Sequence, residues 1–295
     1  HLQQNSPAID AGTDVGFAFN GLAPDISWYE TEYSTGMWEI WVDASADSAS
    51  GDGSADHPFT TIQNALDVVQ DTIDATIWVK PGVYPALYND RRYVDYKLIS
   101  TDGPEETILD FSDNPDGYGM VYRVSRNSNV IDGFKFVNMA DVSYAAFYMW
   151  DNPASIEVRN CIFEDPQGTH WTMFHVNKQI TAKIHHNVFM TPSRNVVMGY
   201  GETTEIYNNT FFKPATDEAL VRAAGDDAGG IPSNGALTAR NNIFFGHPDS
   251  ANTALLRDGF CYLTASNNLF HNMENDMVDG YAPDTTYYLV DEGEN

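Results

Sequence analysis

Basic side chains recur at corresponding points of a repeated pattern in the middle of this chain. If each repeat is aligned as a β-strand, one outward-facing position holds in turn Arg123, Met149, His175, Gly199, Arg222 and Arg257. The chain has only 15 Lys and Arg residues, so three arginines at one position form a local concentration. Arginine can hold a carboxylate through two parallel hydrogen bonds. The column therefore predicts a binding site for an acidic sugar.

This column also suggests a reaction. If Arg222 and Arg257 neutralise a uronate carboxylate, the adjacent C5 proton becomes more acidic, and His175 is a candidate base for its removal in β-elimination. Arg123, Met149 and the nearby Trp171 are candidate substrate-binding residues. The alternative is that these side chains only make an outer face soluble. His185 and His186 are neighbours, and we expect His186 to be structural.

Two acidic loops are candidate calcium sites. Asp226 and Asp227 lie in the insertion 225–235, and they could bind Ca²⁺ or act as paired carboxylates in glycoside hydrolysis. The loop 43–56 carries Asp43, Asp47, Asp52 and Asp56, but it does not follow the EF-hand pattern. The alternative in both places is ordinary loop polarity.

The elements that would position these residues are degenerate repeats, which end in Phe136, Phe163, Phe189, Phe211, Phe244 and Phe270. The intervals between these phenylalanines are 27, 26, 22, 33 and 26 residues. Apolar residues alternate before each one, which is typical of a strand. A period of about 25 residues with strand patterning predicts one solenoid coil per repeat.

Asparagine precedes most of these phenylalanines by two and by three positions. The pairs are Asn208–Asn209, Asn241–Asn242 and Asn267–Asn268, with Asn160 and Asn187 in single repeats. Asparagine tolerates a left-handed backbone and can bond to the same residue of the next coil. We therefore expect a tight turn and an asparagine ladder. Cys161 falls at a repeat position that we expect to be buried and inert.

Residues 38–84 follow a different pattern, with a strand, a loop rich in Asp, Ser and Gly, and one amphipathic helix. Thr60 and Gln63 resemble a capping box, and an apolar stripe follows at Ile62, Ala65, Leu66 and Val69. A helix here would cover the strand edges exposed at the open end of the solenoid.

These residues resemble the pectin-lyase-like superfamily of right-handed parallel β-helices. The resemblance rests on WVDASADSASGDGSADHPFTTIQNALD, on TIWVKPGVY and on the Asn-Asn-x-Phe coils, and it covers roughly residues 38–290. It implies an all-β, single-stranded parallel β-helix over 38–295, with a cap at 38–75 and coils at 76–290. The superfamily includes lyases, glycoside hydrolases, epimerases, adhesins and proteins without known activity, so the fold does not decide function.

Residues 1–33 resemble the segment that closes such a β-helix at its C-terminal end, out of its usual order. A tandem array, a circular permutant and a fragment each explain this order. In an array, the segment would pack on the open last coil of another unit. Such head-to-tail contacts generate filaments unless the rotation closes a ring.

The composition limits the partners. There are 42 Asp and Glu residues and 15 Lys and Arg residues, a net charge of −27, which argues against nucleic acid. No apolar run is long enough to predict a membrane-spanning helix. We therefore expect an extracellular or cell-surface protein that binds or cleaves a polysaccharide, with a lyase preferred to a hydrolase. The alternative is a non-catalytic structural or adhesive module.

Overall fold

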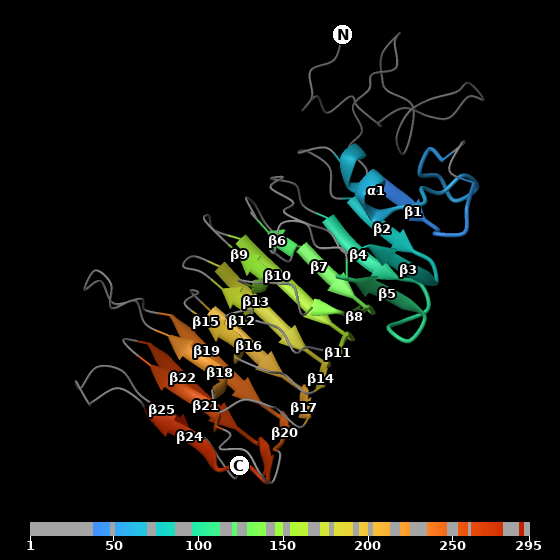
Figure 1. The fold of residues 1–295 in the computed structure, drawn as a ribbon. Coiled ribbons are helices and arrows are strands. Elements are labelled where there is room, and N and C mark those ends of the chain that lie inside the picture. Colours follow the sequence, from blue (N-terminus) through green and yellow to red (C-terminus); the bar gives the residue numbers. More distant parts are fainter. Residues whose placement is uncertain are drawn as a thin grey trace, which may run out of the picture.

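The computed structural model describes residues 38–47, 51–69, 75–85, 96–112, 120–122, 129–139, 145–149, 154–164, 172–176, 180–190, 195–199, 203–212, 219–224, 235–246, 253–258, 261–279 and 289–291. The expectations for residues 1–33 lie outside these ranges. All strands pair in parallel and form three sheets, so the fold is a parallel β-helix, as predicted (Figure 1).

The first sheet has ten strands. They are β1 (Trp38–Val42), β2 (Ala75–Val79), β4 (Tyr96–Ser100), β7 (Asn129–Asp132), β10 (Ala154–Arg159), β13 (Ile180–His185), β16 (Thr203–Tyr207), β19 (Ala236–Arg240), β22 (Tyr262–Ser266) and β25 (Leu289–Asp291).

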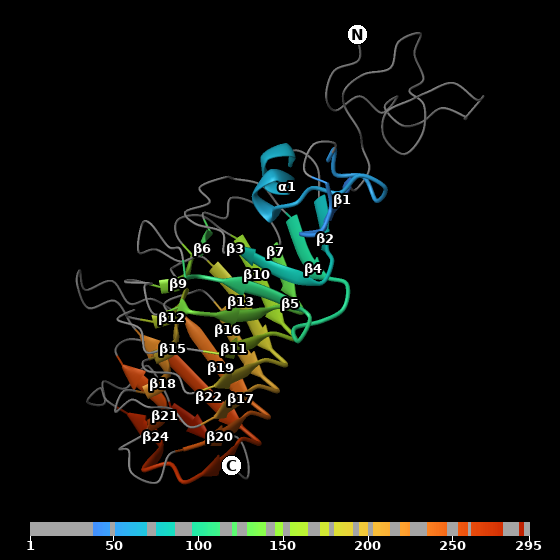
Figure 2. The same ribbon diagram turned by 45° about the vertical axis from the view of Figure 1, so that its right-hand side comes forward.

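The second sheet has eight strands. They are β3 (Gly82–Pro85), β5 (Thr107–Asp110), β8 (Lys135–Val137), β11 (Ile162–Glu164), β14 (Val188–Met190), β17 (Thr210–Phe212), β20 (Ile243–Phe245) and β23 (Leu269–His271). The third sheet has seven. They are β6 (Met120–Tyr122), β9 (Ala145–Met149), β12 (Thr172–Val176), β15 (Asn195–Gly199), β18 (Ala219–Ala224), β21 (Thr253–Asp258) and β24 (Asn275–Asp279). Figures 1 and 2 show the coils stacked from helix α1 (Ile62–Val68) at one end to β24 at the other.

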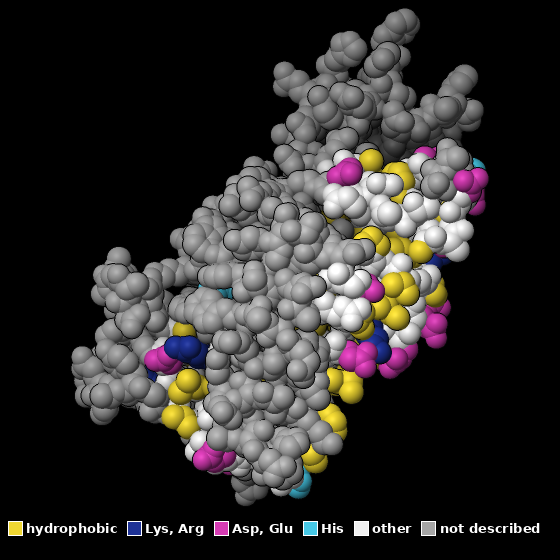
Figure 3. All heavy atoms as spheres, viewed as in Figure 1, with side chains coloured by type: hydrophobic (Ala, Val, Ile, Leu, Met, Phe, Trp, Pro, Cys, Tyr) yellow, Lys and Arg dark blue, Asp and Glu magenta, His cyan; other side chains and the backbone are white. Residues whose placement is uncertain are grey.

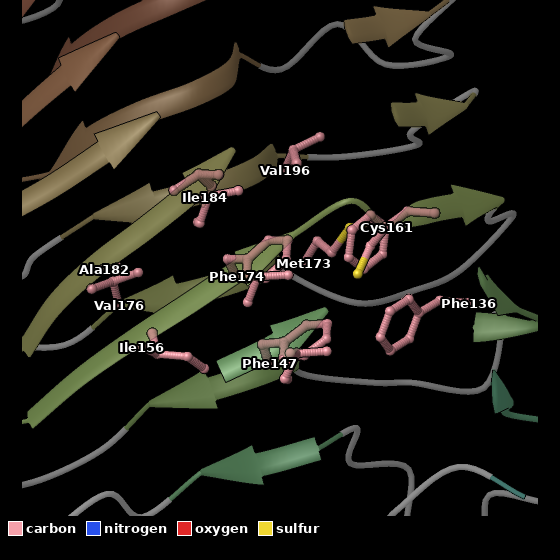
Figure 4. Packing of buried hydrophobic residues seen from close by; sticks show 14 of the residues in the cluster. Phe136, Phe147, Ile156, Cys161, Met173, Phe174, Val176, Ala182, Ile184 and Val196 are labelled. Carbon is pink, nitrogen blue, oxygen red and sulfur yellow. The ribbon is translucent and has the colours of Figure 1, made fainter. Parts of the chain in front are cut away.

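The repeated phenylalanines form the interior of the second sheet. Phe136, Phe163, Phe189, Phe211 and Phe244 have no exposed surface, and the register pairs each one with the next. Consecutive rings stack with centroids 4.6–4.9 Å apart. Phe147 and Phe174 stack in the same way on the third sheet (Figure 4). Each of these coils thus contributes at least one large apolar side chain to the core, and the predicted repeat is confirmed.

The turn between the first and second sheets contains the predicted asparagine ladder. Asn160, Asn208, Asn241 and Asn267 have φ between 54° and 56°, and His186 takes the same conformation in its coil. The next residue is buried and bonds along the solenoid axis. For example, Asn209 donates to the carbonyl oxygen of Ile184 at 2.8 Å and accepts from the backbone N–H of Asn187 at 3.0 Å. Each turn is therefore held in register with the coils before and after it.

The helix forms where the apolar stripe predicts it. Ile62, Ala65 and Leu66 are buried in the core at the end of the solenoid. The N-cap is Thr61, not Thr60, and its side chain accepts from the backbone N–H of Asn64 at 3.2 Å.

Candidate functional site

The predicted column on the third sheet is only partly formed. His175 and Arg222 do share a column, because His175 pairs with Met198 and Met198 pairs with Arg222. Arg257 instead pairs with Ala223, which pairs with Gly199, so it belongs to the neighbouring column. The predicted alignment was therefore wrong by one residue at Met149, Gly199 and Arg257. A one-residue shift turns a side chain to the other face.

Arg257 lies on the interior side of the third sheet. Its side chain is 1% exposed, as is that of Ala223 in the same column. A guanidinium in the core of a coil cannot reach a polysaccharide on the outside. The expected role of Arg257 in neutralising a uronate is therefore corrected, and the residue contributes to the interior instead.

His175 faces outward, but it is 6% exposed. Burial lowers the pKa of its imidazole to about 4, so it is neutral at neutral pH. A general base works best when its pKa lies near the working pH. A shielded imidazole with such a low pKa is a weak acceptor for the C5 proton of a uronate.

Arg222 is about one third exposed and forms an ion pair with Asp258 on β21. The guanidinium of Arg222 is thus already paired with a carboxylate of the protein. The neighbouring outward column, Met173, Val196, Leu220 and Ala254, is buried at 0–1% exposure. Much of the outer face of the third sheet is therefore buried beside Arg222.

The other predicted site residues are placed as follows. Met149 is in β9, in register with Val176 rather than His175. Arg123, Trp171, Asp226 and Asp227 lie outside the described residues. The described ranges contain no group of three or more His, Cys, Asp or Glu side chains placed to hold a metal ion.

The acidic loop 43–56 uses two of its carboxylates in local turns. Asp43 accepts from the hydroxyl of Ser45 at 2.6 Å and pairs with Lys80, while Asp52 accepts from the backbone N–H of Ser54 at 2.9 Å. These bonds lower the pKa of both carboxyls. Loop polarity therefore accounts for both residues.

A second group of polar side chains lies on the outer face of the first sheet, where sequence reasoning expected no site. We call it the histidine–arginine patch, and it consists of Glu157, Arg159, His185, His186, Tyr207, Asn208 and Arg240. Four successive strands position it, because Arg159, His185, Tyr207 and Arg240 are paired in register. Each of the four directly precedes the tight turn of its coil.

Tyr207 is the centre of the patch. His185 stacks on its ring with centroids 4.5 Å apart and planes 10° apart. The guanidinium of Arg240 lies over the ring, 4.9 Å from its centroid. Arg240 is exposed, and among the described residues no carboxylate lies within ion-pairing distance of it. Stacking thus holds an exposed cation in place without neutralising its charge.

The charges in the other half of the patch are satisfied internally. Arg159 bonds to Asp132 at 2.8 Å and to Glu157 at 2.6 Å. Burial acts to lower the pKa of Arg159, but these carboxylates outweigh it and raise the pKa. Glu157 also bonds to Nε2 of His185 at 3.1 Å, and Nδ1 of His185 lies 2.7 Å from Nδ1 of His186. Burial lowers the pKa of His185, and Glu157 opposes that effect.

The sequence does contain a signal for this patch. Arg159, His185, Tyr207 and Arg240 each lie four positions before the phenylalanine of their repeat. The spacing is constant because the same short turn separates the first and second sheets in every coil. Counting back from the phenylalanines therefore finds the column directly.

No protein-family model, curated protein or solved structure matches the chain. Within the described residues, no helix has the length and apolar character needed to cross a membrane.

Proposed function

We propose that the chain is an extracellular parallel β-helix that binds an acidic polysaccharide at the histidine–arginine patch, without cleaving it there. The observation that carries this proposal is the exposed Arg240, which lies over the ring of Tyr207 and has no carboxylate partner among the described residues. A planar guanidinium suits a carboxylate or a sulfate because two N–H groups can donate in parallel.

The surroundings of Arg240 suit a sugar chain. The side chains of Asn208 and Asn241 are exposed beside it, and amides donate to and accept from hydroxyl groups. The register also connects the patch, through Ile99 and Asp132, to Trp78 and Trp41 at the start of the same column. The two indole rings are partly exposed and stacked, with centroids 6.0 Å apart. Aromatic, amide and cationic groups therefore follow one line along the solenoid.

The net charge of −27 does not prevent binding of a polyanion. At physiological ionic strength the Debye length is about 8 Å, so distant carboxylates are largely screened and the local groups dominate. The similarity of the coils to the pectin-lyase-like superfamily supports a polysaccharide as the ligand. Binding is favoured over cleavage because His175 is shielded and Arg257 faces the interior.

The test is calorimetric titration with polygalacturonate and, as a neutral control, dextran. Polygalacturonate should bind and dextran should not, and added salt should weaken the binding. Arg240→Ala should reduce affinity about tenfold or more, the usual scale for a hydrogen bond to a charged group. Arg240→Lys keeps the charge but loses the planar fork, so its affinity should be intermediate. Equal binding of both polymers, or none of either, refutes the proposal.

A second candidate, a structural module that packs against copies of itself, is favoured by one observation. On the outer face of the second sheet, Val83, Ile243 and Leu269 share a column and are 59%, 40% and 58% exposed. Figure 3 shows hydrophobic side chains gathered along the edge formed by β11, β14, β17 and β20. The described charges on this face include the ion pair Lys135–Glu164. Light scattering of wild type and Leu269→Asp tests this, because self-association should rise with salt and fall in the variant.

A further inference from the structure

The two histidines of the patch belong to one row of hydrogen bonds. The side-chain nitrogen of Asn208 lies 3.1 Å from Nε2 of His186. Nδ1 of His186 lies 2.7 Å from Nδ1 of His185, and Nε2 of His185 lies 3.1 Å from Oε1 of Glu157. The row runs from the exposed turn to a partly buried carboxylate.

The groups at the two ends of the row determine which ring nitrogens carry protons. The amide nitrogen of Asn208 can only donate, so Nε2 of His186 accepts and Nδ1 of His186 carries the proton. That proton is donated to Nδ1 of His185. Nε2 of His185 then carries the other proton and donates it to Glu157, which as a carboxylate can only accept. Both imidazoles are neutral in this arrangement, and they have opposite tautomers.

The row can accept one further proton but not two. A proton on Nε2 of His186 disturbs only the contact with Asn208, whose amide can turn to present its oxygen. A second proton would place two N–H donors face to face across the 2.7 Å between the Nδ1 atoms. His185 is only 7% exposed, whereas His186 is exposed, so the added charge resides at the outer end of the row.

The charges that face the pair are balanced. They come from β13 itself, from its neighbours β10 and β16, and from the next strands β7 and β19. They are Asp132 on β7, Glu157 and Arg159 on β10, Lys183 on β13, Glu205 and Tyr207 on β16, and Arg240 on β19. With Tyr207 neutral, three cations (Arg159, Lys183, Arg240) balance three anions (Asp132, Glu157, Glu205). One proton on the histidine pair therefore makes this set of side chains positive overall.

We propose that the His185–His186 pair takes up one proton when an anionic glycan binds beside Arg240, so that the patch holds acidic polysaccharide more tightly as pH falls. This inference rests on the proposed function. Arg240 and His186 belong to coils on either side of Tyr207, two strand spacings or about 10 Å apart along the axis. A linear glycan with repeated anionic groups can contact both, whereas a single small anion cannot.

The sign of the effect follows from linkage. An anion beside His186 favours its protonated form, so the complex binds more protons than the free chain. Lower pH therefore strengthens binding.

The test is calorimetric titration of the full chain with dextran sulfate, whose sulfates do not titrate in this range, at pH 5.5 and 7.5. Each titration is repeated in two buffers of different ionisation enthalpy, which gives the number of protons taken up. Affinity should be about 5–10-fold higher at the lower pH, with up to one proton taken up per patch occupied. His186→Asn, which restores the residue found at this turn in other coils, should lose the proton uptake and the pH dependence. His271→Asn, an exposed histidine on the second sheet, should keep both.

The outcomes separate this inference from the proposed function. If dextran sulfate does not bind at either pH, the proposed function and the proton coupling are both refuted. If it binds with no proton uptake, or if His186→Asn keeps the uptake, only the inference of proton coupling is refuted. Imidazole ¹⁵N NMR of the free chain gives a check that needs no glycan, because His185 and His186 should have opposite tautomers at pH 8. Identical tautomers overturn the proton order.

Discussion

The outer faces of the first and third sheets both carry histidine and arginine, yet the structure uses them differently. On the third sheet His175 is shielded, Arg222 is paired with Asp258, and the adjacent column from Met173 to Ala254 is buried. On the first sheet the outward residues are mostly part-exposed or exposed, and Arg240 retains an unpaired charge among the described residues. The comparison shows that residue type alone does not make a site. Exposure and the partners already present decide which charge is available to a ligand.

The largest expected effect is a difference in the stability cost of substitutions on the outer faces of the third and first sheets. Leu220→Ala, on the outer face of the third sheet, should lower the free energy of unfolding by about 2–5 kcal/mol, because the side chain is fully buried. Thr238→Ala, on the outer face of the first sheet, should change it by less than about 0.5 kcal/mol. Urea denaturation of both variants measures this. Similar losses in the two would contradict the assignment of one buried and one open face.

The turn that positions the patch should depend on its buried asparagine more than on its exposed one. Asn209→Ala removes partners from the carbonyl of Ile184 and the N–H of Asn187, at about 1–3 kcal/mol for each buried group left unsatisfied. Asn208→Gly keeps the left-handed conformation accessible and should cost less than about 1 kcal/mol. Thermal unfolding followed by circular dichroism ranks the two. The reverse order would show that the exposed residue holds the turn.

His175 should make the third sheet sensitive to acid. Its pKa is about 4 in the folded chain against 6.5 ordinarily, so the unfolded chain binds the extra proton. The effect of His175 on the free energy of unfolding is constant above pH 6.5. As pH falls from 6.5 towards 4, the free energy of unfolding decreases by about 1–3 kcal/mol in all. His175→Gln lacks this titration, so the stability difference between wild type and variant should shrink as pH falls through this range. Parallel stability curves for wild type and variant between pH 7 and pH 4.5 would contradict the buried imidazole.

The Arg222–Asp258 ion pair should have the smallest effect. Both side chains are about one third exposed, and such pairs contribute about 0.2–1 kcal/mol. A double-mutant cycle with Arg222→Ala and Asp258→Ala measures the coupling. A value of several kcal/mol would mean that the pair is part of the core rather than a surface contact.

The sequence predicts the first and second sheets well and the third poorly, for a physical reason. A short turn of fixed length joins the first two sheets, so counting from Phe163 or Phe211 keeps every residue in register. The connection to the third sheet varies. Phe163 precedes its interior partner Phe174 by 11 residues, but Phe189 precedes Val197 by 8. That variation accounts for the one-residue error at Gly199.

The sequence prediction missed this patch because it started from the few arginines near the third sheet. It did not compare the residues that occupy one fixed position in every repeat. Arg159 and Arg240 lie at the same repeat position as His185, yet His186 was interpreted only as a substitute for an asparagine of the turn. That interpretation holds for the backbone, because His186 has a φ of 57°. Its contact with His185 could not be predicted, since it depends on how the two rings turn at the end of β13.

The most direct test of the account is one paired titration of Arg240→Ala and Arg222→Ala with polygalacturonate, under identical salt and pH. Both variants remove one outward arginine from the same solenoid, so they alter the net charge equally. The account predicts that Arg240→Ala loses about tenfold or more in affinity while Arg222→Ala binds as the wild type does. Loss of binding in Arg222→Ala, with Arg240→Ala unchanged, would place the site on the third sheet and contradict the central claim.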